Sequence, residues 1–399
     1  MTEILSGVPT LPADRGDSPL DPPAGLIARE PLSPLQFHGG KTGWLVTSYA
    51  LARQILADQR FSTRSELRGF ARRDGEPDRN IERQPTKPGM FLAMDPPEHG
   101  RYRKLLTGQF TVRRMNELIP RIQEIATEHA ESMRRGGSPA DLVREYALPI
   151  PSMVICELLG VPYADRARFQ DGAGRMLKLT SSIEQIRAAI AEMEAYILEL
   201  VAAKRAKPGD DMLSGLIETG ELNDGEMSQM GFLLLLAGHE TTANMLGLGT
   251  YTLLTNPDQL ALLRSDPSLV DNAVEELLRF LTIVHFGASR TALEDVEIDG
   301  RLIKAGDPVS ISLPAANRDP MRFASPGKLD FGGSPAGHLA FGHGIHQCLG
   351  QQLARIEMRI GFTTLLREFP TLRLDVAPEE VPMRSDMAIY GVHKLPVAW

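Results

Sequence analysis

The stretch that decides the fold is Phe341-Gly-His-Gly-Ile-His-Gln-Cys348-Leu-Gly350, and a segment with helical periodicity follows it directly. The glycines predict a loop, so Cys348 would lie at a helix N-terminus, where backbone N–H groups and the helix dipole favour a thiolate. A thiolate in apolar surroundings is costly unless a cation binds it. The stretch therefore predicts a metal-binding cysteine, and haem iron is a cation that accepts this ligand.

The spacing of this stretch says more than its cysteine does. A cysteine after a glycine-rich loop is, taken alone, usually a small buried hydrophobic residue. The full pattern Phe-x-x-Gly-x-x-x-Cys-x-Gly is far more restrictive, and it resembles the haem-binding loop of the cytochrome P450 family. The resemblance implies that Cys348 is the axial ligand of a haem b iron. It also places Phe341, Gly342, His346 and Gly350 at the cofactor.

A second segment, Leu235-Leu-Ala-Gly238-His-Glu240-Thr241-Thr242, interrupts a helix that we predict from about residue 226 to 254. Glycine and paired threonines disfavour a helix interior, and such local breaks tend to mark functional sites, although a kinked buried helix would also explain them. The segment resembles the family's distal-helix pattern, Ala/Gly-Gly-x-Asp/Glu-Thr. The resemblance implies that Thr241 hydrogen-bonds dioxygen during its activation and that Glu240 passes protons inward. Ala237 and Gly238 complete the catalytic set, and we expect Gly238 to leave room for a flat ligand or a water.

A third segment contains Glu276 and Arg279, three residues apart on one helix face, where they could form an ion pair. An exposed pair of this kind contributes little to stability. By resemblance, Glu-x-x-Arg is a buried structural element behind the cysteine loop, completed by an arginine further along the chain. The corresponding stretch, Asn317 to Gly333, lacks an arginine near its end, so Lys328 or Arg318 could substitute.

Candidate anion-binding residues are spread along the chain. His99 and Arg103 follow Asp95-Pro-Pro at helical i, i+4 spacing and therefore share a face. Arg290 and His346 complete the set that the resemblance assigns to the two haem propionates, which need charge-assisted partners when buried. Each of these side chains, taken singly, could equally be a solvated surface group.

Length, charge and cysteine content limit the function classes. The chain has 399 residues and a net charge of −8, which disfavours general nucleic-acid binding. Two cysteines in a chain of this length favour a reducing compartment. We find neither a signal-peptide pattern near the N-terminus nor an apolar run long enough to span a bilayer. The sequence predicts a soluble, cytoplasmic protein that folds as a single domain over residues 1–399.

Helical periodicity dominates the chain, and strand patterns are few. We predict an irregular arm over residues 1–40, a strand near Trp44–Thr47, a hairpin with its turn at Asp299-Gly300, and a helix from about residue 349 to 369. The fold class is mainly α with small β-sheets (α+β). By resemblance it is the cytochrome P450 fold, a triangular-prism helical domain with haem between the long distal helix and the helix of the cysteine loop. Substrate-access segments are expected at residues 61–94 and 171–182.

The resemblance is closest to soluble bacterial members of the family from actinomycetes. It implies a monomeric haem-thiolate monooxygenase that uses O2 and electrons from NAD(P)H, delivered by a ferredoxin and its reductase. The substrate would be a bulky apolar small molecule, such as a polyketide, macrolide or steroid-like secondary metabolite, hydroxylated or epoxidised. Pocket-lining positions assigned by resemblance are Phe91, Leu92, Met94, Leu235, Val284, His285, Phe286 and Ile389. A basic patch for the ferredoxin is expected at Arg103, Lys104, Arg113, Arg114, Arg355 and Arg359.

Three alternatives stay open at this point. A haem-thiolate peroxygenase or isomerase would not use O2, but such proteins usually lack the acid–threonine pair found at Glu240 and Thr241. A cysteine hydrolase could combine Cys348 with His343 or His346, although an orienting acid is not evident nearby. A haem-binding sensor or carrier without turnover would leave the acid–threonine pair without a task.

Overall fold

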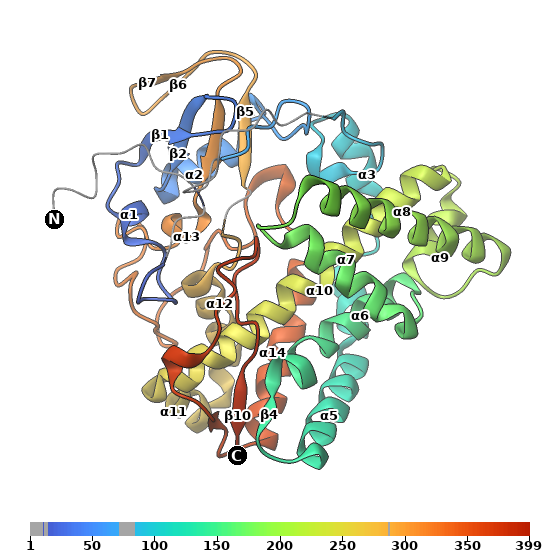
Figure 1. Ribbon diagram of the computed structural model, residues 1–399, viewed down its shortest axis with the longest axis vertical. Coiled ribbons are helices and arrows are strands. Elements are labelled where there is room, and N and C mark those ends of the chain that lie inside the picture. Colours follow the sequence, from blue (N-terminus) through green and yellow to red (C-terminus); the bar gives the residue numbers. More distant parts are fainter. Residues whose placement is uncertain (1–10, 12–14, 72–83, 286–287) are drawn as a thin grey trace. The chain divides into compact units, whose positions relative to one another are not determined.

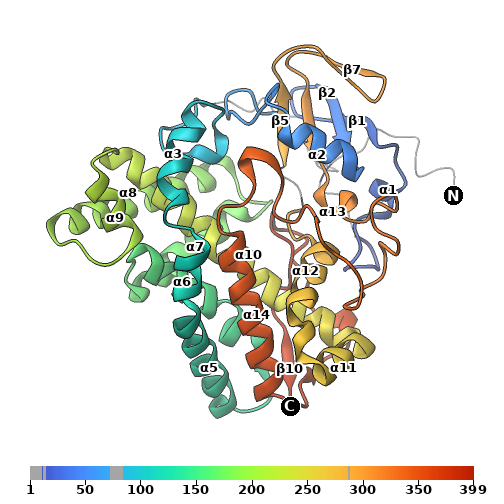
Figure 2. The ribbon, with the colours of Figure 1, turned by 180° about the vertical axis from the view of Figure 1, so that it is seen from behind.

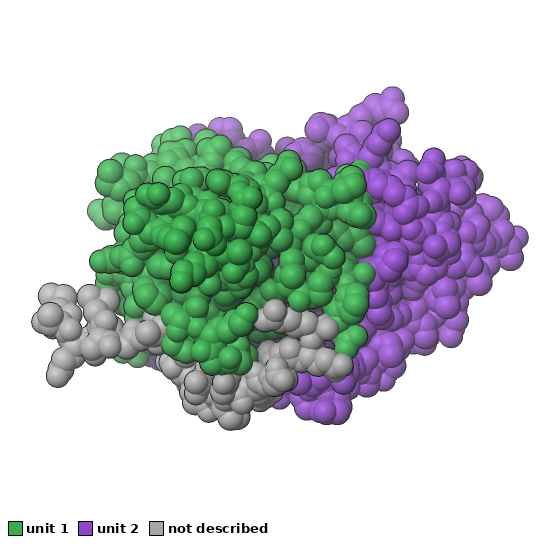
Figure 3. Space-filling view, turned by 90° about the horizontal axis from the view of Figure 1, so that it is seen from above, with its two compact units in different colours: residues 1–86, 92–100, 275–348 green, residues 87–91, 101–274, 349–399 purple. Residues whose placement is uncertain are grey.

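The structure is a computed structural model, and it describes residues 11, 15–71, 84–285 and 288–399. Helices dominate these residues, and small sheets accompany them (Figure 1). Contacts divide the chain into two compact units (Figure 3). Unit 1 comprises residues 1–86, 92–100 and 275–348, and unit 2 comprises residues 87–91, 101–274 and 349–399. Each unit is described by itself.

The helices and strands have the following bounds. The α-helices are α1 (Ala24–Ile27), α2 (Tyr49–Ala57), α3 (Glu98–Thr107), α4 (Val112–Glu117), α5 (Ile119–Gly136), α6 (Pro149–Leu159), α7 (Arg166–Leu177), α8 (Ile183–Ala206), α9 (Met212–Thr219), α10 (Asp224–Thr255), α11 (Pro257–Ser265), α12 (Val270–Leu281), α13 (Leu313–Ala316) and α14 (Gln351–Glu368). The shorter helical turns are η1 (Phe91–Ala93), η2 (Val143–Ala147), η3 (Tyr163–Asp165), η4 (Pro267–Leu269), η5 (Gly344–His346) and η6 (Pro378–Glu380). The strands are β1 (Leu32–Gln36), β2 (Thr42–Val46), β3 (Phe61–Ser62), β4 (Ala140–Asp141), β5 (Ser289–Ala292), β6 (Val296–Ile298), β7 (Arg301–Ile303), β8 (Pro308–Ile311), β9 (Arg373–Leu374) and β10 (Pro396–Ala398).

Unit 1 is built around a sheet with the strand order β1-β2-β8-β5-β3. Strand β2 pairs with β8 in parallel, with Trp44 opposite Val309, and the other neighbours pair antiparallel. Every residue of β8 is buried, because this strand lies in the middle of the sheet. Buried side chains of the sheet form one cluster with Ile55 and Leu56 of α2. This core supports the loop that carries Cys348, since η5 contacts α2.

Unit 2 is built around α10, which contacts α6, α8 and α14 (Figures 1 and 2). The helix begins in a capping box, in which Asn223 Oδ1 accepts from the Glu226 N–H and Glu226 Oε2 accepts from the Asn223 N–H. Most of its 32 residues are buried. Among the described residues, however, neither this helix nor another combines the length and apolarity that crossing a membrane requires.

Most of the expected elements are confirmed. The strand expected at Trp44 is β2, the hairpin with the Asp299-Gly300 turn is β6 and β7, and the two expected long helices are α10 and α14. Asp299 and Gly300 both have positive φ, as a two-residue hairpin turn of this kind requires.

One expectation differs from the structure, and the roles of the two access segments stay predictions. The arm expected to be irregular over residues 1–40 contains α1 and β1, because Leu32 and Leu35 are buried and β1 completes the edge of the sheet. Of the access segment expected at residues 171–182, residues 171–177 are helical in α7. The access segment expected at residues 61–94 begins in β3 and includes η1, and residues 72–83 lie outside the described residues.

Candidate functional site

The loop before α14 presents Cys348 in a fixed backbone conformation. Gly342 and Gly344 both have positive φ, at 69° and 75°. The Cys348 N–H donates to the Phe341 carbonyl at 2.9 Å and closes the loop. A side chain at position 344 would place its Cβ 2.5 Å from the Leu56 carbonyl oxygen of α2, so only glycine fits there.

The two cysteines lie in different environments. Cys348 is exposed, whereas Cys156 of α6 is buried with 1% of its surface accessible. Burial, followed by the nearby Asp165 charge, raises the pKa of the Cys156 thiol to about 12. Cys156 is therefore an inert core residue, whereas Cys348 is the thiol that lies at the surface.

A polar network in unit 1 orients His346. Its Nε2 lies 3.3 Å from Thr63 Oγ1, and its ring packs against that of His99 at a tilt of 54°, with the centroids 4.3 Å apart. Asp95 accepts hydrogen bonds from Ser62 Oγ at 2.5 Å and from the Thr63 N–H at 2.9 Å. The network therefore fixes the segment that carries Thr63 and, through it, the ring of His346.

Arg290 of β5 supplies a buried cation in the same unit. Burial, followed by the charge of Arg68, lowers the pKa of its guanidinium to about 10 against the opposing effect of Asp95. Its Nη1 donates to the Ser289 carbonyl at 3.0 Å. A buried arginine that feels a second arginine provides a favourable place for an anionic group.

These residues fit a haem group in their chemistry. An exposed thiol can bind the iron, and Arg290, His346 and His99 are the donor types that hold carboxylates. Arg103, the fourth predicted member, is half-buried on α3, one helical turn after His99.

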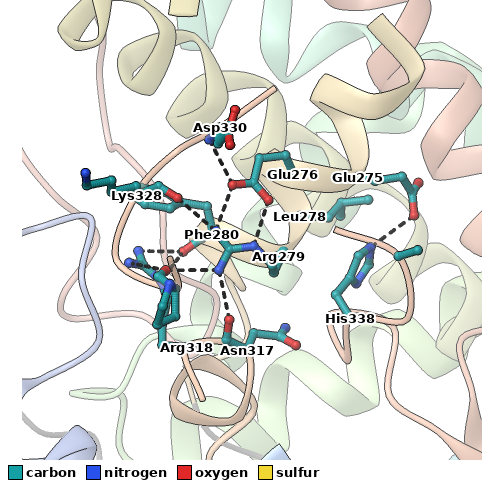
Figure 4. Close-up of polar contacts among 12 residues, drawn as sticks. Glu275, Glu276, Leu278, Arg279, Phe280, Asn317, Arg318, Lys328, Asp330 and His338 are labelled. Carbon is teal, nitrogen blue, oxygen red and sulfur yellow. Dashed lines mark hydrogen bonds and ion pairs between the residues drawn. The ribbon is translucent and has the colours of Figure 1, made fainter. Parts of the chain in front are cut away.

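Glu276 and Arg279 of α12 form a buried ion pair, as the resemblance implied (Figure 4). Arg279 Nε and Nη2 donate to the two carboxylate oxygens at 2.7 Å each, and both side chains are only 4% exposed. The remaining N–H groups of Arg279 donate to the carbonyls of Asn317, Pro326 and Lys328, each at 3.0 Å. The pair thus fastens the irregular segment before the cysteine loop to α12.

Backbone groups occupy the place expected for a third charged side chain. Lys328 is exposed and contributes its carbonyl oxygen, while the Asp330 N–H donates to Glu276 Oε1 at 3.0 Å. Arg318 donates to the Phe280 and Leu20 carbonyls, pairs with Asp21 at 3.1 Å, and shares the Pro326 carbonyl with Arg279. The expectation that the Lys328 side chain substitutes in the triad is therefore wrong, whereas Arg318 is linked to Arg279 through a shared carbonyl.

Asn317 joins the end of α12 to the segment that leads into the cysteine loop. Its Nδ2 donates to Thr282 Oγ1 at 2.8 Å, and its Oδ1 accepts from the Leu339 N–H at 2.7 Å. Thr282 has a φ of 37°, which is strained for a β-branched residue. The neighbouring His338 Nε2 lies 3.1 Å from Glu275 Oε2 (Figure 4). These contacts hold the approach to the loop.

The middle of α10 carries accessible residues in an otherwise buried helix. Ala237 is exposed, and Gly238 and Thr241 are half-buried. Thr241 Oγ1 donates to the Ala237 carbonyl one turn earlier, at 2.9 Å. Ala237 and Thr241 therefore share an accessible face, as an oxygen-binding face would require.

The role expected for Gly238 is wrong. A Cβ at this position would lie 2.7 Å from the Ile155 side chain of α6, so the glycine permits close helix packing rather than leaving room for a ligand.

Glu240 is buried and already paired. Its Oε2 lies 3.0 Å from Arg384 Nη2 and accepts from Asn244 Nδ2 at 3.2 Å. Its neighbour His239 is fully buried, with Nδ1 2.7 Å from the Leu235 carbonyl, and burial lowers its pKa. The Arg384 pairing was missed, because the two residues stand 144 positions apart and sequence pattern offers no signal at that range.

A second buried glutamate was also missed. Glu357 of α14 is 2% exposed, and burial raises the pKa of its carboxyl to about 8 against the opposing effect of a hydrogen bond with Thr242 of α10. Its apolar neighbours in sequence were the available signal, because a glutamate on the inward stripe of an amphipathic helix departs from the pattern.

The predicted pocket residues differ in exposure. Phe91, Met94 and His285 are buried, Val284 and Ile389 are half-buried, and Leu92 is 53% exposed. Leu235 is fully buried and belongs to the core of unit 2. Phe286 lies outside the described residues.

Comparisons with known proteins agree with this chemistry. The model of the family described as Cytochrome P450 matches residues 174–394. Cytochrome P450-SU2 of Streptomyces griseolus is 48% identical over 394 residues, covering 98% of this chain and 97% of that protein. Pentalenic acid synthase of Streptomyces avermitilis is 43% identical over 402 residues, covering 99% and 98%. The crystal structure of CYP105P1 in complex with filipin I superposes with a TM-score of 0.90 at 45% identity, covering 98% of this chain and 99% of that one. The chain therefore belongs to the cytochrome P450 family of haem- and O2-dependent oxidoreductases, among members of the actinomycete type.

Proposed function

We propose that the protein is a haem-thiolate monooxygenase that hydroxylates or epoxidises a bulky, mainly apolar secondary metabolite. The observation that carries this proposal is the loop closed between Phe341 and Cys348, which presents an exposed thiol in a family of haem enzymes. Haem, when bound, would supply the activation of O2 that side chains cannot perform.

The residues of the chain would bind, orient and protonate. Cys348 would be the iron ligand, and His99, Arg103, Arg290 and His346 would hold the propionates through charge-assisted hydrogen bonds. Gly342 and Gly350 would keep the loop close to the cofactor. The Thr241 hydroxyl, on the accessible face of α10, would donate a hydrogen bond where oxygen is activated, and Glu240 would supply protons to it.

Similar proteins support the substrate class. One solved relative carries filipin I, and another similar protein is named for the synthesis of pentalenic acid. Both names point to natural products rather than to small polar metabolites. We infer that the substrate of this chain is a natural product too.

Electrons would come from NAD(P)H through a ferredoxin and its reductase. Arg113 and Arg114 lie on α4, and Arg355 and Arg359 lie on α14, which contacts α4. Arg113 is highly exposed, at 87% of its side chain. Arg113 and Arg359 each lie near a carboxylate, Glu117 at 3.7 Å and Asp271 at 3.5 Å, and we infer that an acidic partner would compete for these exposed cations. A monomeric state and a cytoplasmic location stay predictions.

The absorption spectrum of the reduced, carbon-monoxide-bound protein tests the ligand. We expect a strongly red-shifted Soret band in the wild type and in Cys156→Ala, but not in Cys348→Ala. Cys156→Ala is the matched control because it removes the other thiol. A folded wild type that binds no haem, or a Cys348→Ala protein with an unchanged spectrum, would refute the proposal.

Turnover assays separate the monooxygenase from the peroxygenase alternative. We expect product with NADPH, ferredoxin, reductase and O2. Product with peroxide alone would favour the alternative. Screening natural products, with filipin I as a first probe, for a substrate-induced spin shift would identify the substrate.

A further inference from the structure

The last part of the chain folds back on itself in a hairpin, residues 382–393, which we call the C-terminal hairpin. Met383 bridges Val392, the Arg384 N–H donates to the Gly391 carbonyl at 2.9 Å, and the His393 N–H donates to the Pro382 carbonyl at 2.8 Å. These hydrogen bonds join the two sides of the hairpin. A displacement of its tip would therefore also displace Arg384.

One side of this hairpin contacts Glu240 of α10. Arg384 and Glu240 are paired at 3.0 Å, and their side chains are only 13% and 8% exposed. Asn244 reinforces the pair, since its Nδ2 donates to both the side chain and the carbonyl of Glu240. A Cβ at Gly391 would lie 2.0 Å from Asn244 Oδ1, so the hairpin approaches α10 as closely as glycine permits.

The tip of the hairpin is bonded to a different segment. The Leu179 N–H donates to the Asp386 carbonyl, and the Ala388 N–H donates to the Leu177 carbonyl, both at 2.8 Å. Lys178 bridges Met387 between them. Leu177 is the last residue of α7, so these bonds attach the hairpin to the end of that helix.

The pairing constrains what Glu240 can do. Arg384 and Asn244 both bind Oε2, and a carboxylate so held keeps one orientation. A group that carries a proton between solvent and a reacting site must change partners as it does so. To act as a relay, Glu240 therefore has to change its contact with Arg384, and a movement of the hairpin that carries Arg384 would change that contact.

We propose that Arg384 is a positioning residue that sets when Glu240 can transfer protons, and that the C-terminal hairpin makes this setting depend on the position of residues 177–179. A substrate that displaces the end of α7 would shift the hairpin tip and change the hold on Glu240. The catalytic consequence of this inference rests on the proposed monooxygenase function. The mechanical link between the C-terminal hairpin and residues 177–179 does not depend on that function.

The catalytic part is tested in the haem-loaded protein with Arg384→Leu, Arg384→Lys and the control Arg373→Ala, which changes an exposed arginine of β9. The readouts are the share of NADPH electrons recovered in product and the solvent deuterium isotope effect on product formation. We expect Arg384→Leu to lower that share by at least about fivefold and to change the isotope effect. Arg384→Lys should recover most of the wild-type behaviour, and Arg373→Ala all of it.

A wild-type isotope effect and electron yield in Arg384→Leu would overturn the catalytic part. If Arg384→Leu does not fold, Arg384→Gln removes the charge at similar size and gives the same readouts. A wild type that shows no red-shifted carbon-monoxide band would instead refute the proposed function itself.

The mechanical part is tested by hydrogen exchange without turnover. We expect amides of residues 177–179 and 386–388 to exchange about tenfold faster in Arg384→Leu than in wild type, Arg384→Lys or Arg373→Ala. Unchanged exchange at residues 177–179 would show that the hairpin does not link the two segments.

Discussion

At Glu276, Glu240 and Glu357 the same side chain is buried in three different ways. Glu276 is closed into a pair with Arg279, Glu240 is held by an arginine from a distant hairpin, and Glu357 has a threonine as its hydrogen-bond partner. A buried carboxylate with a matched cation is a structural anchor, whereas one with a neutral partner favours its protonated form. The three residues should therefore respond differently to substitution.

Glu357→Gln should change the pH dependence of stability. The folded-state pKa, about 8, lies above the usual value of 4.5, so between these pH values the folded protein binds one more proton than the unfolded chain. The free energy of unfolding of the wild type therefore falls as pH rises through this window, by up to about 1.4 kcal/mol per pH unit. Glutamine cannot titrate, so its curve should lack this component. Urea unfolding at about pH 5, 6, 7 and 8 measures it, and parallel curves for the two proteins would contradict the assignment.

Glu276→Ala should destabilise the protein strongly, whereas Lys328→Ala should have little effect on its stability. Removing Glu276 leaves Arg279 buried without its carboxylate, which should cost about 3–5 kcal/mol of unfolding free energy. Lys328 contributes its backbone carbonyl, which alanine retains, so Lys328→Ala should change stability by less than about 0.5 kcal/mol. Equal destabilisation in denaturant titrations would mean that the Lys328 side chain does complete the triad.

The residues that local sequence could identify are those whose chemistry depends on near neighbours. Cys348 and the Glu276–Arg279 pair follow from spacings of a few residues. The groups that complete the same cluster are carbonyls of Asn317, Pro326 and Lys328, and backbone groups are the same in every sequence. The Arg384–Glu240 pair depends on tertiary packing and has no local signature at either residue.

Among the elements, the two long helices predicted at about residues 226–254 and 349–369 are confirmed as α10 and α14. Asn223 caps the start of α10, which fixes where that helix begins. The segment at residues 171–182 was expected to give access to substrate, and its first part belongs to α7. Phe169 and Ala173 are fully buried on that helix, so packing favours helix there despite the glycines.

Gly344→Ala should reduce haem retention by disturbing the element that carries Cys348. Alanine at a φ of 75° costs about 1–3 kcal/mol, and its Cβ would meet Leu56 of α2. Gly327→Ala is the matched control, because a Cβ there has nothing within 4 Å. The ratio of haem to protein absorbance after purification measures the effect. A Gly344→Ala protein with full haem content would show that the loop tolerates another backbone path.

For the whole molecule, the sequence predicted the fold class and the family, since the motifs occur in order along nearly the full chain. The mainly helical architecture with small sheets is confirmed, and it matches the cytochrome P450 fold of the solved relatives. A single domain over residues 1–399 stays a prediction beside the two compact units. Substrate identity could not be derived, because it depends on the shape of a pocket built from segments far apart in sequence.

Electron delivery should depend on salt if an acidic ferredoxin binds the basic residues of α4 and α14. We expect the rate of ferredoxin-driven reduction to fall as ionic strength rises, because screening weakens long-range attraction. Arg113→Glu should slow reduction at low salt, whereas Arg135→Glu, an exposed arginine at the end of α5, should not. Stopped-flow reduction at several salt concentrations measures both. A rate in Arg113→Glu equal to that of the wild type would place the docking surface elsewhere.

The carboxamide of Asn317 has a consequence for redesign of the enzyme. This group donates a hydrogen bond to the strained Thr282 and accepts one from the backbone N–H of Leu339, ahead of the cysteine loop. One end of the amide is therefore a donor and the other an acceptor. Aspartate at this position would lose the hydrogen-bond donor, and leucine would lose both the donor and the acceptor. The position is therefore a poor target for substitution. An engineer who wishes to alter the residues after Thr282 should therefore leave this amide in place and expect changes on one side of it to be felt on the other.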